Sequence, residues 1–350
     1  MHIILLLSTA AALKWVRHAV PLSGTLVLTD VHAALDGGRI VALTTGEEGV
    51  LLKLDVPANT SPAGSAWQVL RNPGVDWYGA YVFNATSFLL SGFIDGGGVA
   101  YGVVSYSDDG GGRWGNDTKI DPCSQPVCAW GGGPIEFASV LEGYMPSTSG
   151  QSAWRTQAGG RNASAWREVV PSPGNWHAGN YVYDGAGYIA IAGSSDCAST
   201  DFAETWACSA PVDASGMDTG IACGGSLCIT GGGEISPSVA GWVHVSVDGG
   251  RTYAPQRALQ APYPVRTLQV VPSSGAGAPV LVAAGGNYFS SAGGVFSSGD
   301  GGKTWAEDID LGQEVKACRS LPLPAQGVTR IFCVSAGAKG GSIISADVPL

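Results

Sequence analysis

Charged side chains are scarce in this chain, and positive charge is the scarcest. Only 13% of the 350 residues are charged, and 18 Lys and Arg stand against 28 Asp and Glu, for a net charge of −10. The basic residues are spread along the chain rather than clustered as phosphate binding requires, so we expect no nucleic-acid partner. No stretch approaches the roughly 20 apolar residues of a transmembrane helix, so we expect no membrane span.

The composition also excludes several classes of non-globular protein. Hydrophobic residues make up 45% of the chain, with 11 Trp and 11 Tyr, and the 53 Gly follow no collagen period. Many Gly and aromatic residues with few charges are typical of short strands joined by tight turns. No Cys pair has His at zinc-ligand spacing, so we expect no metal and no other cofactor.

The N-terminal residues 1–12 resemble a short secretory signal peptide. An apolar run from Ile3 to Leu7 precedes the small residues Ser8 to Ala12. The apolar run is short and His2 is the only polar residue that precedes it, so a mistaken start codon is the alternative explanation.

Two further features favour secretion. Four N-x-S/T sequons, where chance supplies about one, predict glycosylation at Asn59, Asn84, Asn116 and Asn162. The eight Cys lie in near pairs, which predicts the disulfides Cys123–Cys128, Cys197–Cys208, Cys223–Cys228 and Cys318–Cys333. Buried free thiols are the alternative for these Cys.

Three segments follow one template, Ser-x-Asp-x-Gly-x-x-aromatic. The matching residues are Ser107, Asp109, Gly111 and Trp114; Ser246, Asp248, Gly250 and Tyr253; and Ser298, Asp300, Gly302 and Trp305. An Asp carboxylate can accept hydrogen bonds from backbone N–H groups of its own turn, and Gly supplies positive φ. The template therefore indicates a structural turn rather than a reactive site.

This template resembles the Asp-box of the BNR/Asp-box β-propellers, which include sialidases, sortilin-type receptors, xyloglucan hydrolases and photosystem assembly factors. Degenerate copies fill the gaps: Thr60 to Trp67, Thr156 to Trp166, and Ser194-Ser195-Asp196 leading to Thr205-Trp206. The copies start at residues 60, 107, 156, 194, 246 and 298, a spacing that suits one four-stranded blade each. The resemblance implies an all-β propeller.

We expect residues 13–350 to form a single domain, a seven-bladed β-propeller of four-stranded blades. The last unit lacks a fourth strand, and the segment from Trp15 looks like a fourth strand without its first three. Pairing of residues 15–22 beside residues 342–347 would close the ring and leave no exposed sheet edge. Six blades is the alternative, because the unit from Trp176 to Pro211 is short and irregular.

Candidate ligand-binding residues lie on the loops that enter the innermost strands of the expected propeller. They are Asp30, His32, Asp76, Trp77, Tyr78, Trp130, Trp176 and His177. Exposed aromatic rings beside polar groups suit the apolar faces and hydroxyls of sugars. The alternative is that the Trp residues fill the core and the His residues are structural.

The hydrolase alternative lacks its motifs. The alternative is a sialidase-like or other exo-acting glycoside hydrolase. Resemblance to the sialidases would require three convergent Arg for the substrate carboxylate, a Tyr–Glu nucleophile pair, an Asp as the acid and an Arg-Ile-Pro motif. The closest match is Arg39-Ile40-Val41, and no catalytic residue is singled out. We therefore predict a secreted, monomeric propeller that binds a glycan or an extracellular protein, with the plastid lumen as the alternative compartment.

Overall fold

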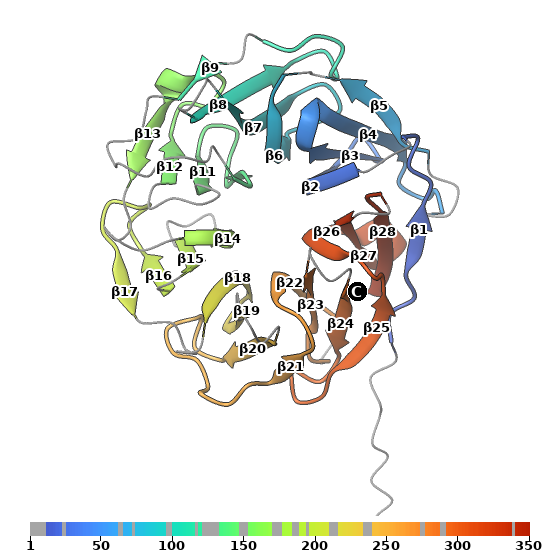
Figure 1. Cartoon of the computed structure of the whole chain (residues 1–350), viewed down its shortest axis with the longest axis vertical. Coiled ribbons are helices and arrows are strands. Elements are labelled where there is room, and N and C mark those ends of the chain that lie inside the picture. Colours follow the sequence, from blue (N-terminus) through green and yellow to red (C-terminus); the bar gives the residue numbers. More distant parts are fainter. Residues whose placement is uncertain are drawn as a thin grey trace, which may run out of the picture.

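In the computed structural model the chain forms small antiparallel sheets arranged around a central axis as in a β-propeller (Figure 1). The structure describes residues 12–22, 26–61, 66–71, 74–95, 100–115, 118–120, 133–146, 153–169, 177–183, 189–193, 196–209, 216–233, 240–273, 277–287, 292–337 and 340–350. The expected all-β propeller architecture is confirmed. Within these residues, no helix is long and apolar enough to cross a membrane.

Five sheets each contain four strands that are consecutive in the sequence. The first sheet contains β6 (Asp76–Val82), β7 (Phe88–Asp95), β8 (Ala100–Ser107) and β9 (Thr118–Lys119), and the second contains β10 (Glu136–Phe137), β11 (Gly143–Pro146), β12 (Ala153–Thr156) and β13 (Trp166–Val169). The third contains β14 (His177–Tyr183), β15 (Ile189–Gly193), β16 (Asp196–Ser199) and β17 (Ala207–Ser209), and the fourth contains β18 (Met217–Gly224), β19 (Leu227–Gly233), β20 (Gly241–Ser246) and β21 (Leu259–Ala261). The fifth contains β22 (Val265–Val271), β23 (Val280–Asn287), β24 (Ala292–Ser298) and β25 (Ala306–Asp310).

The remaining strands form one eight-stranded sheet made of two groups of four. The groups are β2 (Leu26–Asp36), β3 (Arg39–Gly46), β4 (Val50–Pro57) and β5 (Gln68–Arg71), and β26 (Glu314–Leu323), β27 (Val328–Gly337), β28 (Ile343–Pro349) and β1 (Val16–His18). Among the described residues, two pairs between β2 and β27 join the groups. The short 3₁₀ segments are η1 (Glu47–Gly49), η3 (Ala163–Ala165) and η4 (Pro324–Gln326).

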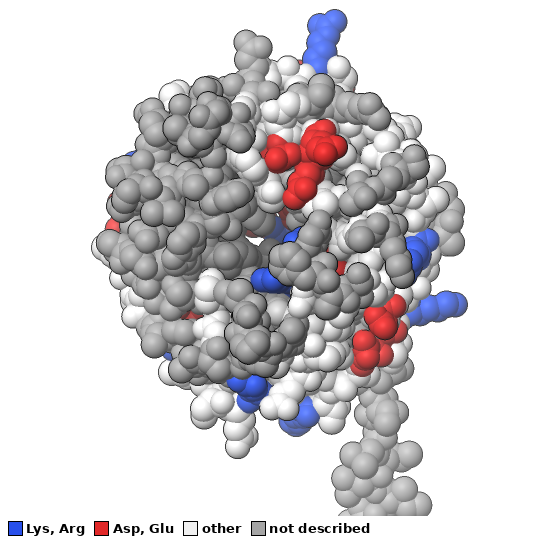
Figure 2. Space-filling model, viewed as in Figure 1, with Lys and Arg blue, Asp and Glu red and all other residues white. Residues whose placement is uncertain are grey.

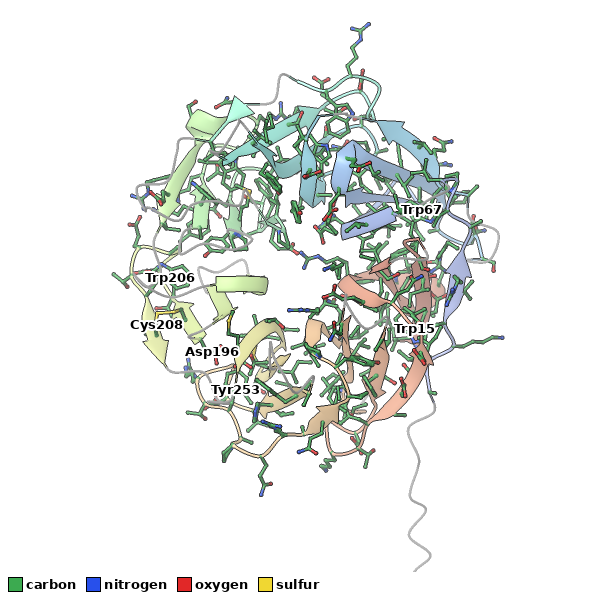
Figure 3. The ribbon with its side chains drawn as sticks, in the orientation of Figure 1. Trp15, Trp67, Asp196, Trp206, Cys208 and Tyr253 are labelled. Carbon is green, nitrogen blue, oxygen red and sulfur yellow. A yellow bond between two sulfur atoms is a disulfide. The ribbon has the colours of Figure 1, made fainter. Side chains whose placement is uncertain are left out.

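The N-terminal strand closes the last group, as the sequence predicted. Val16 pairs with Ser345 and His18 with Ile343, in antiparallel register. The Trp15 indole Nε1 donates to Asp308 Oδ2 at 3.2 Å, which fixes the approach to this strand (Figure 3). Because β1 covers the free side of β28, that strand presents no unpaired edge there.

The alternating strand directions define two faces of the ring. In each group of four, the turns from first to second and from third to fourth strand lie at one end, which we call the hairpin face. The second-to-third connections and the starts of the first strands lie at the opposite end, which we call the mouth face. Figure 1 shows the first strands β2, β6, β14, β18, β22 and β26 nearest the axis.

The template turns lie on the hairpin face and are closed by their own side chains. The Ser246 hydroxyl donates to Asp248 Oδ1 at 2.7 Å and accepts from the Gly250 N–H at 3.0 Å. Asp248 also accepts from the Thr252 N–H at 2.9 Å. The turns that begin at Ser107 and Ser298 repeat the Ser–Asp and Gly–Ser bonds.

A fourth turn of this kind begins at Ser199, whereas Ser194, where the sequence suggested its start, lies outside the described residues. Ser199 donates to Asp201 at 2.8 Å and accepts from the Ala203 N–H at 2.8 Å. Asp196 instead lies in β16, where it pairs with Ser209. This register is not evident in the sequence because Phe202 and Ala203, at φ of 61° and 64°, occupy positions that are Gly in the other turns.

Three of the four expected disulfides are present: Cys197–Cys208, Cys223–Cys228 and Cys318–Cys333, each with Cα atoms 4.1 Å apart. In each case the two Cys are directly opposite each other on neighbouring antiparallel strands. Cys123 and Cys128 lie outside the described residues. The described part of the chain holds no free Cys.

Candidate binding site on the mouth face

A recurring β-bulge marks the mouth face. Near the start of β2, β6, β18, β22 and β26, the pairing with the second strand skips one residue of the first strand. The skipped residues, which we call the bulge ring, are Thr29, Tyr78, Thr219, Arg266 and Lys316. A bulge redirects the side chain of its extra residue, and such bulges are common beside functional sites. One structural feature therefore repeats around the opening with different side chains.

Two of these positions tie neighbouring sheets together. The Thr29 hydroxyl donates to the Trp77 carbonyl, and the Thr219 hydroxyl donates to the Val265 carbonyl. Each acceptor directly precedes the bulge residue of the next first strand. The short side chains of Thr29 and Thr219 thus link neighbouring sheets. The longer side chains of Tyr78, Arg266 and Lys316 are the candidates for contacts with a ligand.

Arg266 and Lys316 share a single buried carboxylate. Arg266 Nε lies 2.9 Å from Glu314 Oε1, and Lys316 Nζ lies 2.6 Å from Glu314 Oε2. Glu314 is 1% exposed, whereas the Arg266 and Lys316 side chains are 37% and 31% exposed. Both cationic side chains therefore contact Glu314 and remain partly accessible to solvent or to a ligand.

Carboxylates gather on an adjoining part of the same face. Asp76 Oδ1 accepts from the Glu48 N–H at 2.7 Å, and the Tyr78 hydroxyl donates to Glu47 Oε1 at 3.4 Å. Burial and the Asp76 charge raise the pKa of Glu47 above its usual value. Figure 2 shows an acidic cluster beside the central opening, over the elements around β2 and β6, and Lys or Arg side chains at the opening itself.

Deeper along the axis, Arg319 of β26 connects three groups of four strands. Its Nη1 lies 2.7 Å from Glu136 Oε1 of β10, and its Nε lies 4.0 Å from Asp30 Oδ1 of β2. Asp30 is fully buried, and this burial raises the pKa of its carboxyl to about 6. Burial likewise raises the pKa of Glu136. The positive charge of the guanidinium therefore offsets the free-energy cost of removing these carboxylates from water.

The candidate residues Asp30 and His32 hold β2 against β6. Asp30 Oδ2 accepts from the Ala80 N–H at 3.1 Å, and His32 Nδ1 accepts from the Val82 N–H at 3.1 Å. Burial, aided by the Arg319 charge, lowers the pKa of His32 to about 3, so the ring is neutral at physiological pH. The structure therefore supports the structural alternative for His32.

Among the candidate aromatic residues that the structure describes, Trp77 does not provide the expected exposed ring. Trp77 is fully buried, because its side chain packs into the core beneath β6, so it offers no surface for stacking. Tyr78 is half-buried and stacks on Phe93, with ring centroids 5.5 Å apart. Trp130 and Trp176 lie outside the described residues, and His177 is described only as the first residue of β14.

Among the residues whose side chains the structure describes, no three Arg converge as the sialidase hypothesis requires. Arg39 pairs with Asp55 at 2.7 Å at the hairpin end of β3, away from the innermost strands. Among the residues with described side chains, Arg266 and Arg319 are the Arg residues on first strands. Both already contact carboxylates, and no group of three or more His, Cys, Asp or Glu in the described residues could hold a metal.

A buried carboxyl pair was not predicted from the sequence. Burial and the neighbouring Asp218 charge raise the pKa of Asp196. Trp242 Nε1 donates to Asp218 Oδ1 at 2.9 Å, and Asp218 is fully buried. Figure 3 shows Asp196 nearer to the central axis than Cys208, whose strand lies at the periphery of the ring. No local pattern signals this pair, since its members belong to different sheets.

Known structures share the architecture. The structure described as YCF48 bound to D1 peptide superposes with a TM-score of 0.61 and 14% sequence identity, covering 95% of this chain and 96% of that one. A crystal structure of a nidogen/laminin complex matches with a TM-score of 0.46 and 10% identity, covering 81% and 92%. No family model and no curated protein matches the chain. At such low identity, the likeness to the YCF48 structure shows that this chain shares its β-propeller fold.

Proposed function

We propose that this chain is a binding module that holds a segment of a partner protein on its mouth face, against the bulge ring. The observation that carries the proposal is the arrangement of Arg266, Lys316 and Glu314. Two partly exposed cations lie beside one buried carboxylate there, so both can reach an incoming carboxylate. Charge-assisted hydrogen bonds of this kind are stronger than neutral ones.

A polypeptide fits the face better than a neutral glycan. The acidic cluster of Glu47, Glu48 and Asp76 would attract a basic side chain, while Arg266 and Lys316 would bind a carboxylate. A peptide segment can carry charges of both signs, and complementary charges fix the register of such a ligand. A glycan remains the alternative ligand, with Tyr78 as the ring on which it would stack.

The same proposal includes the finer architecture. We count each group of four strands in the eight-stranded sheet as a blade, which gives seven blades in one domain, 13–350. We take the Ser-x-Asp turns as Asp-boxes, since four of them repeat the same hydrogen bonds. The disulfides favour an oxidising compartment, so we propose that the protein is secreted, with a plastid lumen as the alternative.

Selection of peptides tests the proposal directly. A random-peptide display library is panned on the full chain, and the peptides recovered are titrated by calorimetry against wild type and variants. Arg266→Gln and Lys316→Gln should each weaken binding by about tenfold or more, as expected for centrally placed charged contacts. The matched controls Arg251→Gln and Lys303→Gln change exposed residues of hairpin-face turns and should leave affinity unchanged.

Three outcomes would contradict the proposal. Recovered peptides whose affinity is equally sensitive to the controls would show that binding is nonspecific charge attraction. Binding on a glycan array, with no peptide recovered, would favour the glycan alternative. Turnover of a fluorogenic sialoside or β-glucan that a single carboxylate substitution abolishes would show a hydrolase.

A further inference from the structure

The described sequons share one face of the propeller. Asn59 lies between β4 and β5, Asn84 between β6 and β7, and Asn162 between β12 and β13. The first and third of these are turns from third to fourth strand, and the second is a turn from first to second strand. All three therefore lie on the hairpin face. Asn116, in the fourth sequon, lies outside the described residues.

The local geometry suits modification of these side chains. Asn59 and Asn162 are exposed and Asn84 is partly exposed. In two sequons the hydroxyl donates to the Asn side-chain oxygen, at 3.0 Å from Thr86 to Asn84 and 2.7 Å from Ser164 to Asn162. Because those hydroxyls donate to the carboxamide oxygen, they do not occupy the carboxamide nitrogen, which is the atom that an N-linked sugar modifies.

Exposed apolar side chains lie beside one of these sites. Val140 and Leu141 are 72% and 53% exposed, in the turn between β10 and β11. The Gly159 N–H donates to the Leu141 carbonyl at 2.9 Å, so the turn that carries Asn162 packs against this pair. A sugar chain on Asn162 would begin next to the pair and cover it.

We infer that N-linked glycans on Asn59, Asn84 and Asn162 cover the hairpin face, and that the mouth face stays bare for the protein partner. In the covalent step, the carboxamide nitrogen displaces a lipid pyrophosphate from the anomeric carbon of an oligosaccharide. A C–N bond forms as a C–O bond breaks, the nitrogen loses a proton, and the lipid pyrophosphate leaves with the electron pair. The assignment of glycans to these three Asn does not depend on the proposed function. The inference that the mouth face stays free of glycans for the protein partner does rest on the proposed function.

Site occupancy is measured on the full chain secreted from eukaryotic cells. Enzymatic deglycosylation in heavy-oxygen water, followed by peptide mass spectrometry, should label all three Asn as heavy Asp. Ser61→Ala should abolish labelling at Asn59 by removing its sequon, whereas the matched control Thr60→Ala keeps that sequon and should leave labelling intact. Absence of label from the three sites in wild type would overturn the inference.

A new sequon on the mouth face tests the second half. Glu48 lies in η1 at φ 56°, a backbone conformation that Asn adopts more readily than most residues, so Glu48→Asn adds no backbone strain at that position. Combined with Val50→Thr, it creates an N-x-T sequon. The glycosylated double variant should lose about tenfold or more in affinity for the selected peptides, because steric exclusion removes the central contacts.

The single variant Glu48→Asn is the matched control, since it removes the same charge without creating a sequon. Full deglycosylation of the wild-type protein should leave peptide affinity unchanged. A double variant that carries the sugar and binds as well as its control would overturn the assignment of the mouth face. In that case labelled Asn59, Asn84 and Asn162 would still support the glycan assignment, so the two failures are distinguishable.

Discussion

Ser199 and Asp201 are joined by a 2.8 Å hydrogen bond that has the same geometry as the bond from Ser246 to Asp248. The two turns share this arrangement although one has Gly249 and Gly250 where the other has Phe202 and Ala203. The side-chain bonds therefore define the turn more strongly than the Gly residues do.

We predict that Ser199→Ala destabilises the protein as much as Ser246→Ala does. Each Ser is buried and accepts a backbone N–H, from Ala203 or Gly250, that would lose its partner. The free energy of unfolding should fall by about 1–2 kcal/mol in each case, measured by urea denaturation. A much smaller loss for Ser199→Ala than for Ser246→Ala would contradict the prediction.

Removing Arg319 should expose the cost of the buried carboxylates. Arg319→Gln leaves Asp30 and Glu136 without their shared cation, so we expect a loss of about 3–5 kcal/mol in unfolding free energy. Adding Asp30→Asn should restore part of it, because the carboxamide oxygen still accepts the Ala80 N–H without a charge. Arg39→Gln, which breaks the exposed pair with Asp55, should cost less than about 1 kcal/mol. Equal losses for the two Arg variants would refute the prediction.

The Asp196–Asp218 pair should make stability depend on pH. The pKa of Asp196 in the folded protein is raised from 3.8 toward about 8, so the native state binds a proton that the unfolded chain releases. This contribution is present below about pH 4 and is lost as the pH rises through about 8. Asp196→Asn should therefore match wild type near pH 4 and exceed it by about 1–2 kcal/mol at pH 9.

The exposed Asp108→Asn is the control for this pH profile and should leave it unchanged. Stability is followed by urea denaturation at each pH. A wild-type profile that stays flat between pH 5 and pH 9, or one that Asp196→Asn leaves unaltered, would show that the two carboxyl groups share no proton.

The disulfides should differ in their contribution to stability according to loop length. The Cys318–Cys333 bridge closes a separation of 15 residues and Cys223–Cys228 one of 5. The chain-entropy relation gives about 3 kcal/mol for the longer loop and about 2 kcal/mol for the shorter. Replacing each pair by Ala and measuring unfolding in urea tests the order, which would be reversed if native packing outweighed loop entropy.

Local chemistry was readable from the sequence where neighbouring residues decide it. The Ser-x-Asp turns at Ser107, Ser246 and Ser298 close through bonds within eight residues, and three near Cys pairs join adjacent strands. The incomplete last unit also required a fourth strand from elsewhere in the chain, and the segment beginning at Trp15 was available. The repeat and the need to cover a sheet edge thus determined the architecture.

The tertiary structure alone decided which side chains meet at the mouth face. Trp77 and Tyr78 look equivalent in sequence, but strand alternation turns Trp77 into the core, and the bulge re-aims Tyr78. Arg319, Glu136 and Asp30 lie far apart along the chain and meet because their strands surround one axis. The sequence determined the repeated turns and the closure of the ring, because these follow from local hydrogen bonding and edge pairing. The bulge ring and the buried charges depended on the register of strands and the packing of separate sheets, which no local pattern encodes.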